Sequence, residues 1–161
     1  MNANFYGTKS SKLLLAIFLI IGLVVGGVIS YWASTVLQES SYNVQEISLV
    51  DASIKETGNT QLKIPIANND ADKGHYYTVT FQTDSSLSVY IGDTLLPRTD
   101  NIYSHTFYLD SRDSVTKNYI IRVGTLPETT TSISYNIAVN VYVDTDSEPL
   151  TQRNIEITVT K

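Results

Sequence analysis

The chain contains no cysteine, which excludes disulfide frameworks, thiol nucleophiles, Cys-ligated zinc and iron–sulfur clusters. It is also short of cations, with 11 Lys plus Arg against 16 Asp plus Glu in 161 residues, a net charge of −5. Because Lys9 and Lys12 are the only charged residues before Glu39, residues 39–161 carry 11 − 2 = 9 bases against 16 acids, or −7. This composition argues against a nucleic-acid partner and leaves room for one ordinary domain.

One stretch of the chain has no charge and is apolar on every side. Residues 13–32 read LLLAIFLIIGLVVGGVISYW, and twenty helical residues cover roughly the 30 Å hydrocarbon core of a bilayer. We predict a transmembrane helix over residues 13–34. Lys9 and Lys12 precede it, so the positive-inside rule places a tail of residues 1–12 in the cytoplasm. We expect a single-pass protein of the cell membrane, with a stalk at residues 35–42 and an extracytoplasmic domain over residues 43–161.

Two other interpretations of the apolar stretch stay open. Val28 and Ser30 form a tolerable cleavage pair for a secretory signal peptide, although the apolar core is longer than the usual one of about 7–15 residues. A prepilin-type leader would be cut between the basic residues and the helix. Lys12 directly precedes Leu13 there, whereas prepilins carry Gly or Ala before the cut. The sequence therefore favours an anchor that is retained.

Small residues recur at every fourth position of the predicted helix: Gly22, Gly26, Ser30 and Ser34. This spacing lets two helix backbones approach closely, either in a homodimer or against a helix of a larger membrane complex. Glycine is common in membrane helices in any case, so composition alone explains the pattern equally well.

After the stalk, the pattern changes to an alternation of apolar and polar residues, which is typical of strands with one buried face. The clearest run covers residues 133–143. Similar runs cover residues 62–66, 77–81, 87–91 and 155–159, and weaker ones cover residues 47–49, 103–109 and 120–123. Turn-rich segments separate these runs. We therefore predict a mainly β domain, an immunoglobulin-like antiparallel β-sandwich of 7–8 strands.

The sequence offers little for catalysis. A serine nucleophile needs a histidine base, and the two histidines, His75 and His105, both fall within predicted strands. We interpret them as ordinary strand residues. The chain has no glycine-rich phosphate loop and no His-Glu-x-x-His motif. We predict that the protein is not an enzyme and has no resident cofactor.

Two acidic turns carry oxygen ligands at alternate positions, as calcium loops do. The first contains Asn68, Asp70 and Asp72, and the second contains Asp144, Asp146 and Glu148. The first turn departs from an EF-hand because Val79 stands where the bidentate glutamate belongs. Solvated turns are the favoured interpretation. A calcium ion shared by the two loops is the alternative.

Four tyrosines lie opposite the apolar positions of the predicted strands: Tyr76, Tyr108, Tyr119 and Tyr142. Outward tyrosines are good strand formers, and they are also common in surfaces that contact proteins or glycans. We interpret them as an interaction surface.

The passage over residues 123–139 resembles the approach to strand F in fibronectin-III and immunoglobulin-like modules, with Leu126-Pro127 followed by Tyr135-x-Ile137-x-Val139. Tyr135 matches the tyrosine of those modules whose hydroxyl bonds back to the backbone, the tyrosine corner. The resemblance implies an immunoglobulin-like fold and a buried hydrogen bond from Tyr135.

The whole arrangement, a short tail, one membrane helix and a Cys-free outer sandwich, is similar to archaeal pilin-like envelope proteins and most like the archaellum stator family. The resemblance implies that the sandwich binds a surface-layer protein and anchors a filament motor. An accessory subunit of a transporter or respiratory complex is the second hypothesis. An adhesin or a pilin-like filament subunit is the third.

Overall fold

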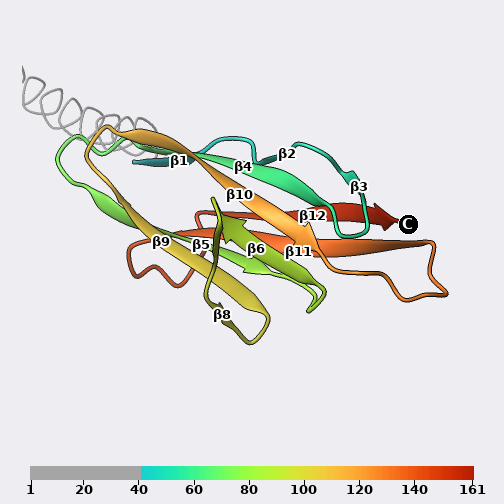
Figure 1. Cartoon of the computed structure of the whole chain (residues 1–161). Coiled ribbons are helices and arrows are strands. Elements are labelled where there is room, and N and C mark those ends of the chain that lie inside the picture. Colours follow the sequence, from blue (N-terminus) through green and yellow to red (C-terminus); the bar gives the residue numbers. More distant parts are fainter. Residues whose placement is uncertain (1–40) are drawn as a thin grey trace, which may run out of the picture. The chain divides into compact units, whose positions relative to one another are not determined.

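The computed structural model describes residues 41–161, which belong to one compact unit, Ser40–Lys161. These residues form twelve strands in two facing sheets (Figure 1). No helix in this part of the chain is long and apolar enough to cross a membrane. The predicted tail, the helix over residues 13–34 and its small residues at 22, 26, 30 and 34 lie outside the described residues.

The first sheet has the strand order β1-β4-β10-β6-β7, and β2 also pairs with β4. All paired strands within this sheet run antiparallel to each other. Its strands are β1 (Tyr42–Val44), β2 (Ser48–Leu49), β4 (Asn59–Asn68), β6 (Leu87–Ile91), β7 (Thr94–Leu95) and β10 (Ser114–Val123).

The second sheet has the strand order β3-β12-β11-β5-β9-β8. One of its pairs, β3 with β12, is parallel, and the others are antiparallel. Its strands are β3 (Ser53–Lys55), β5 (His75–Gln82), β8 (Arg98–Thr99), β9 (Ile102–Leu109), β11 (Ser132–Val143) and β12 (Thr151–Thr160). The predicted β-sandwich is thus confirmed as a layered architecture, with additional short strands and one parallel pair.

The core lies between the sheets and is built from the alternating apolar positions seen in the sequence. Thirteen of these side chains are no more than 1% exposed: Leu62, Ile64, Ile66, Tyr77, Val79, Phe81, Leu87, Val89, Ile137, Val139, Val141, Ile157 and Val159. Burying a side chain of this size contributes about 1.5–3 kcal/mol before entropy is subtracted. The inward alternation therefore accounts for both the strand register and the closure of the sandwich.

The prediction for Tyr119 was wrong, because this residue is completely buried. Its ring packs edge-on against Phe81 with centroids 4.7 Å apart, and its hydroxyl lies 3.0 Å from His105 Nδ1. The error has a simple cause. Tyr119, Ile120 and Ile121 are three large residues in a row, so the sequence does not show which two face inward, and a shift of one residue reverses every assignment.

Tyr135 is buried in β11, but its hydroxyl has no hydrogen-bond partner anywhere in residues 41–161, so the expected tyrosine corner is absent there. A different tyrosine makes such a bond. The Tyr103 hydroxyl on β9 donates to the Leu87 carbonyl across the sandwich at 3.0 Å, and the bond is buried.

Replacing Tyr103 by Phe should therefore lower the free energy of unfolding by about 1–2 kcal/mol, because the Leu87 carbonyl loses its buried donor. Tyr135→Phe is the matched control and should change it by less than about 0.5 kcal/mol. Urea unfolding of both variants measures the difference. Equal losses in the two variants would contradict the assignment.

Candidate functional site

His75, the first residue of β5, holds together the two acidic loops that the sequence picked out. Its Nδ1 lies 2.7 Å from Asp144 Oδ2, and its Nε2 lies 3.2 Å from Asp70 Oδ2. The side chain of His75 is buried, whereas those of Asp70 and Asp144 are 23% and 44% exposed. We call these three residues the histidine triad. The loop that follows β4 and the loop that follows β11 therefore lie at the same end of the sandwich.

The geometry of the triad favours a charged imidazolium, because both ring nitrogens face carboxylate oxygens and only the protonated ring donates from both. The hydrogen bond to Asp144 raises the pKa of His75 above its ordinary value, against an opposing effect of burial and with a further contribution from Asp70. The hydrogen bond to His75 lowers the pKa of Asp144, and the Tyr76 N–H lowers it further. The backbone N–H of Asp72 is the largest cause of the lowered pKa of Asp70, followed by the bond to His75.

The remaining oxygens of the two carboxylates bind backbone N–H groups. Asp144 Oδ1 accepts from Tyr76 N–H at 2.9 Å. Asp70 Oδ1 accepts from the N–H groups of Asp72 and Lys73, at 2.8 and 3.2 Å. Each carboxylate thus fixes its own loop with one oxygen and the histidine with the other.

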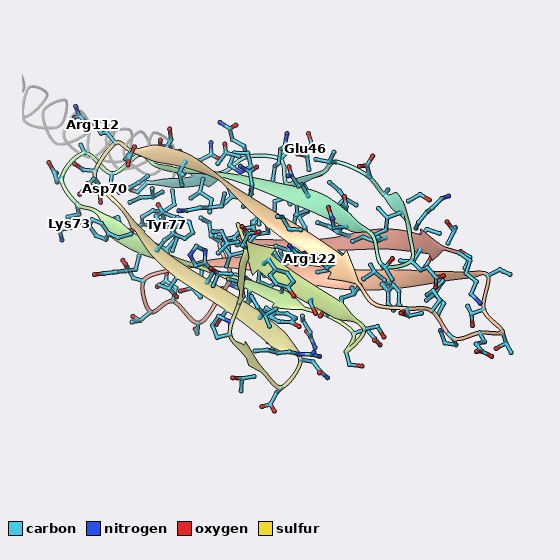
Figure 2. All side chains as sticks on the ribbon, viewed as in Figure 1. Glu46, Asp70, Lys73, Tyr77, Arg112 and Arg122 are labelled. Atoms are coloured by element: carbon cyan, nitrogen blue, oxygen red, sulfur yellow. The ribbon has the colours of Figure 1, made fainter. Side chains whose placement is uncertain are left out.

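Asn68, the last residue of β4, is the buried anchor of the same end and is only 1% exposed. Its Nδ2 donates to the carbonyls of Lys73 and Asp110 at 2.9 and 2.8 Å and lies 3.4 Å from that of Leu109. Its Oδ1 accepts from Asp70 N–H at 3.1 Å. One side chain thereby ties the loop after β4 to the loop after β9. Figure 2 shows Asp70, Lys73 and Arg112, from these two loops, gathered at this end.

The two acidic loops meet, and both contact the imidazole of His75, which lies where a shared calcium ion was the alternative. Asn68 directs its amide at backbone groups, and Asp70 and Asp144 direct their carboxylates at His75 and backbone N–H groups. In residues 41–161 no cluster of three His, Asp or Glu side chains is arranged to hold a metal ion. Calcium binding by Asp72, Asp146 and Glu148 together with these residues stays a prediction.

The histidine triad predicts a stability maximum at mildly acidic pH. Because the pKa of His75 is raised in the folded state, protonated His75 stabilises the fold. This stabilisation is complete below the unfolded pKa of 6.5 and is lost as the pH rises through the raised value. Because the pKa values of Asp70 and Asp144 are lowered in the folded state, the two ionised carboxylates also stabilise the fold. Their contribution is present above the unfolded pKa of 3.8 and is lost as the pH falls through the lowered values. The thermal midpoint should therefore be highest between these two values.

Melting curves of the full-length protein and of His75→Gln, recorded across this range, test the prediction. The decline of the midpoint from about pH 6 into the alkaline range should be much weaker in the variant, because no imidazolium is left to deprotonate. A wild-type midpoint that keeps rising above about pH 7 would show that the triad does not stabilise the fold.

Two tyrosines form an exposed aromatic pair next to the triad. Tyr76 on β5 and Tyr108 on β9 lie directly opposite each other, with ring centroids 5.1 Å apart. They are 57% and 49% exposed. Tyr142 is half-buried on the neighbouring strand β11, opposite Thr78. Three of the four predicted surface tyrosines therefore share the outer face of the second sheet, and we call Tyr76 with Tyr108 the tyrosine pair.

Gly74 leaves room for the side chain of Tyr108 at this end of the sandwich. A Cβ atom on residue 74 would stand 2.0 Å from the Tyr108 hydroxyl oxygen and 2.9 Å from the Leu109 carbonyl oxygen. No other residue type fits there without displacing the ring. The tyrosine pair is thus held by the loop beneath it as well as by its two strands.

The sequence identifies the acids of the triad but not His75, because its place in the alternating pattern is that of an ordinary strand histidine. The available signal was its position directly after the first acidic turn, five residues from Asp70. The bond to Asp144 spans 69 residues, so it depends on which strand ends share an edge. His105, by contrast, has a pKa lowered by burial and by the charge of Lys117, and its Nδ1 faces the buried Tyr119 hydroxyl.

No protein-family profile matches this chain, and no curated protein matches it. The solved structures that match part of the chain are diverse. One is the alkylpurine DNA glycosylase AlkC of Pseudomonas fluorescens bound to DNA, with a TM-score of 0.45 and 13% identity over 78% of this chain. The match spans about a third of the glycosylase, 32% of its length.

Two further structures are matched over most of their length. The CARDB domain of the Pyrococcus furiosus protein PF1109, in complex with di-metal ions, has a TM-score of 0.42 and 15% identity, over 73% of this chain and 91% of that one. The collagen-binding subdomain ACE19 of an Enterococcus faecalis surface protein has a TM-score of 0.34 and 10% identity, over 74% and 99%. Similarity at this level does not assign the chain to a family.

Proposed function

We propose that this protein is a non-enzymatic, membrane-anchored interaction protein whose outer domain binds an envelope or surface-layer protein. The observation that carries the proposal is the tyrosine pair, two neighbouring rings about half exposed at one end of a sheet. Tyrosine is enriched among the residues that dominate protein interfaces, because it contributes a large contact area at low cost in side-chain entropy.

The surroundings of the tyrosine pair support a preorganised surface. The rings stand on adjacent strands, Gly74 leaves room for Tyr108, and Asn68 and the histidine triad fix the loops behind them. A surface that is already ordered loses little freedom on binding, so more of its contact energy appears as affinity.

We further propose that the domain is an immunoglobulin-like module. The order β1-β4-β10-β6 against β12-β11-β5 corresponds to strands A-B-E-D against G-F-C of a constant-type immunoglobulin domain. In this correspondence the β8–β9 hairpin is an insertion between D and E, which places β9 as an extra edge strand beside β5.

The archaellum stator family supplies the most specific form of the proposal, in which the apolar segment over residues 13–34 anchors the protein and the sandwich links the membrane to the surface layer. An accessory subunit of a larger membrane complex remains the second candidate function. In that case the small residues of the anchor, and not the tyrosine pair, would make the decisive contact.

Binding of the detergent-solubilised full-length protein to purified surface-layer protein tests the proposal. The double variant Tyr76→Ser, Tyr108→Ser should bind at least about tenfold more weakly, since interface tyrosines often contribute more than about 1.4 kcal/mol each. Tyr142→Ser on the same face is the matched control. If the double variant binds as well as wild type, or if the protein copurifies only with a transporter or respiratory complex, the proposal fails.

A further inference from the structure

Among residues 41–161, two stretches of the second sheet's edges have no neighbouring strand. β8 pairs with β9 only at Ile102 and Tyr103, so β9 is open from Ser104 onward. β3 pairs with β12 only from Thr158 onward, so the beginning of β12 is also open. β9 pairs with β5 along one side, and only the short β8 pairs with the other. An open edge presents unpaired N–H and C=O groups to which another strand can bind.

The two open edges differ in charge. The open part of β12 contains Arg153 and Glu156, and charged side chains are a common protection against strand pairing. The open part of β9 reads SHTFYL and contains no Lys, Arg, Asp, Glu or Pro. In a domain that carries a net charge of −7 over residues 39–161, β9 is a strand on which two copies can meet without opposing carboxylates.

The hydrogen bonds show which residues of β9 face the open edge. Ser104 N–H donates outward, to the Pro97 carbonyl at 3.2 Å. Backbone groups of an edge strand alternate between the two sides, so Thr106 and Tyr108 also turn their N–H and C=O groups outward. His105 and Phe107 direct theirs toward β5, where they lie opposite Val79 and Tyr77. Within the described domain, Thr106 and Tyr108 therefore keep both their N–H and their C=O groups unpaired.

We propose that a second copy of this chain pairs with β9 in an antiparallel, two-fold symmetric arrangement centred on Phe107. In this register Thr106 of each copy lies opposite Tyr108 of the other, which forms four backbone hydrogen bonds. The register centred on Thr106 would bring Tyr108 opposite Ser104, whose N–H is already bound to Pro97. The geometry therefore selects one register, and it closes both edges at once.

The pairing also brings Phe107 of the two copies together, with Lys117 Nζ 4.2 Å from the centroid of each ring. Phe107 is half-buried, with its ring stacked 6.0 Å from that of Tyr77, and in the dimer it faces its symmetry mate as a non-hydrogen-bonded pair. Aromatic residues in such cross-strand pairs stabilise sheets. Because the outer faces of the two sheets become continuous, the two tyrosine pairs lie on one composite surface, which goes beyond the function proposed for a single domain.

Single-cysteine crosslinking of the full-length protein tests the register, since the chain has no cysteine of its own. Opposed Cα atoms in a non-hydrogen-bonded pair lie about 4.5 Å apart, within the range of about 4.4–6.8 Å that a disulfide spans. Phe107→Cys should therefore oxidise mainly to a disulfide-linked dimer. Leu95→Cys, on the exposed edge strand β7 of the other sheet, is the matched control and should stay largely monomeric.

A second pair of variants protects the test against misfolding of Phe107→Cys. A mixture of Thr106→Cys and Tyr108→Cys chains should form more disulfide-linked dimer than either variant forms on its own. Thr106→Pro, whose lost N–H faces the open edge, should abolish crosslinking at 107 while the thermal transition persists. The proposal would be overturned by crosslinking at residue 95 equal to that at residue 107, or by no gain in dimer when the two variants are mixed. It would also be overturned if the chain stayed monomeric and bound an extended peptide instead.

Discussion

Replacing Asn68 by Ala should lower the free energy of unfolding by about 3 kcal/mol, a large loss for a single side chain at the end of a strand. The amide of Asn68 donates to the carbonyls of Lys73 and Asp110 and accepts from Asp70 N–H. The residue is only 1% exposed. Alanine leaves these groups without partners, at a cost of about 1–3 kcal/mol for each that water cannot reach.

The thermal midpoint of Asn68→Ala should fall by about 10 °C for a domain of this size. Asn136→Ala on the outer face of β11 is the matched control, because Asn136 is exposed and its side chain makes no hydrogen bond in the described domain. It should change the midpoint little. Asn68→Asp should be as damaging as Ala, since a carboxylate cannot donate to the two carbonyls. A wild-type melting curve for Asn68→Ala would disprove the anchoring role.

Replacing Gly74 by Ala should both destabilise the domain and disturb the tyrosine pair. The added methyl group would lie 2.0 Å from the Tyr108 hydroxyl and 2.9 Å from the Leu109 carbonyl, so the ring must swing out and the backbone of β9 must shift. Overpacking of this kind costs about 1–3 kcal/mol. We also expect weaker binding to the proposed surface-layer partner, because Tyr108 leaves its position beside Tyr76.

The double variant Gly74→Ala, Tyr108→Ser separates these two effects. Without the ring, only the contact with the Leu109 carbonyl remains, so most of the lost stability should return. Tyr108→Ser alone gives the reference. Urea unfolding of the four proteins closes a double-mutant cycle. A coupling energy near zero between residues 74 and 108 would mean that Gly74 is not there to accommodate the tyrosine.

The layers and most of the core could be predicted from sequence because alternation determines which face is buried. Runs such as 62–66 and 77–81 alternate without interruption, and their inward residues are buried as expected. The alternation fails at Tyr119, where large residues stand in sequence, and there the prediction reversed the faces. Fold class therefore follows from local pattern, whereas individual surface residues require the register.

The candidate site was only half predictable for a related reason. Asp70 and Asp144 were recognisable as members of acidic turns, but which turns share an end depends on the path of every strand between them. The same limit applies to Tyr135 and Tyr103. The motif around Tyr135 suggested a hydroxyl-to-backbone bond, while the bond that forms joins Tyr103 to Leu87, whose strands belong to different sheets.

The parallel pair β3–β12 has a mechanical consequence. The described chain begins near Tyr42, opposite Asn68, and ends beyond Thr160, opposite Ser132, so its two ends leave the sandwich at opposite poles. Once β1 and β2 have separated from β4, tension between the ends would pull β3 and β12 along their common axis in opposite directions. Their pairing, including the bonds from Thr158 N–H to Ala52 and from Glu56 N–H to Thr160, would then be loaded in shear. Bonds loaded in shear share the force and break together, whereas bonds that are unzipped break one after another, so this pair can act as a clamp under pulling.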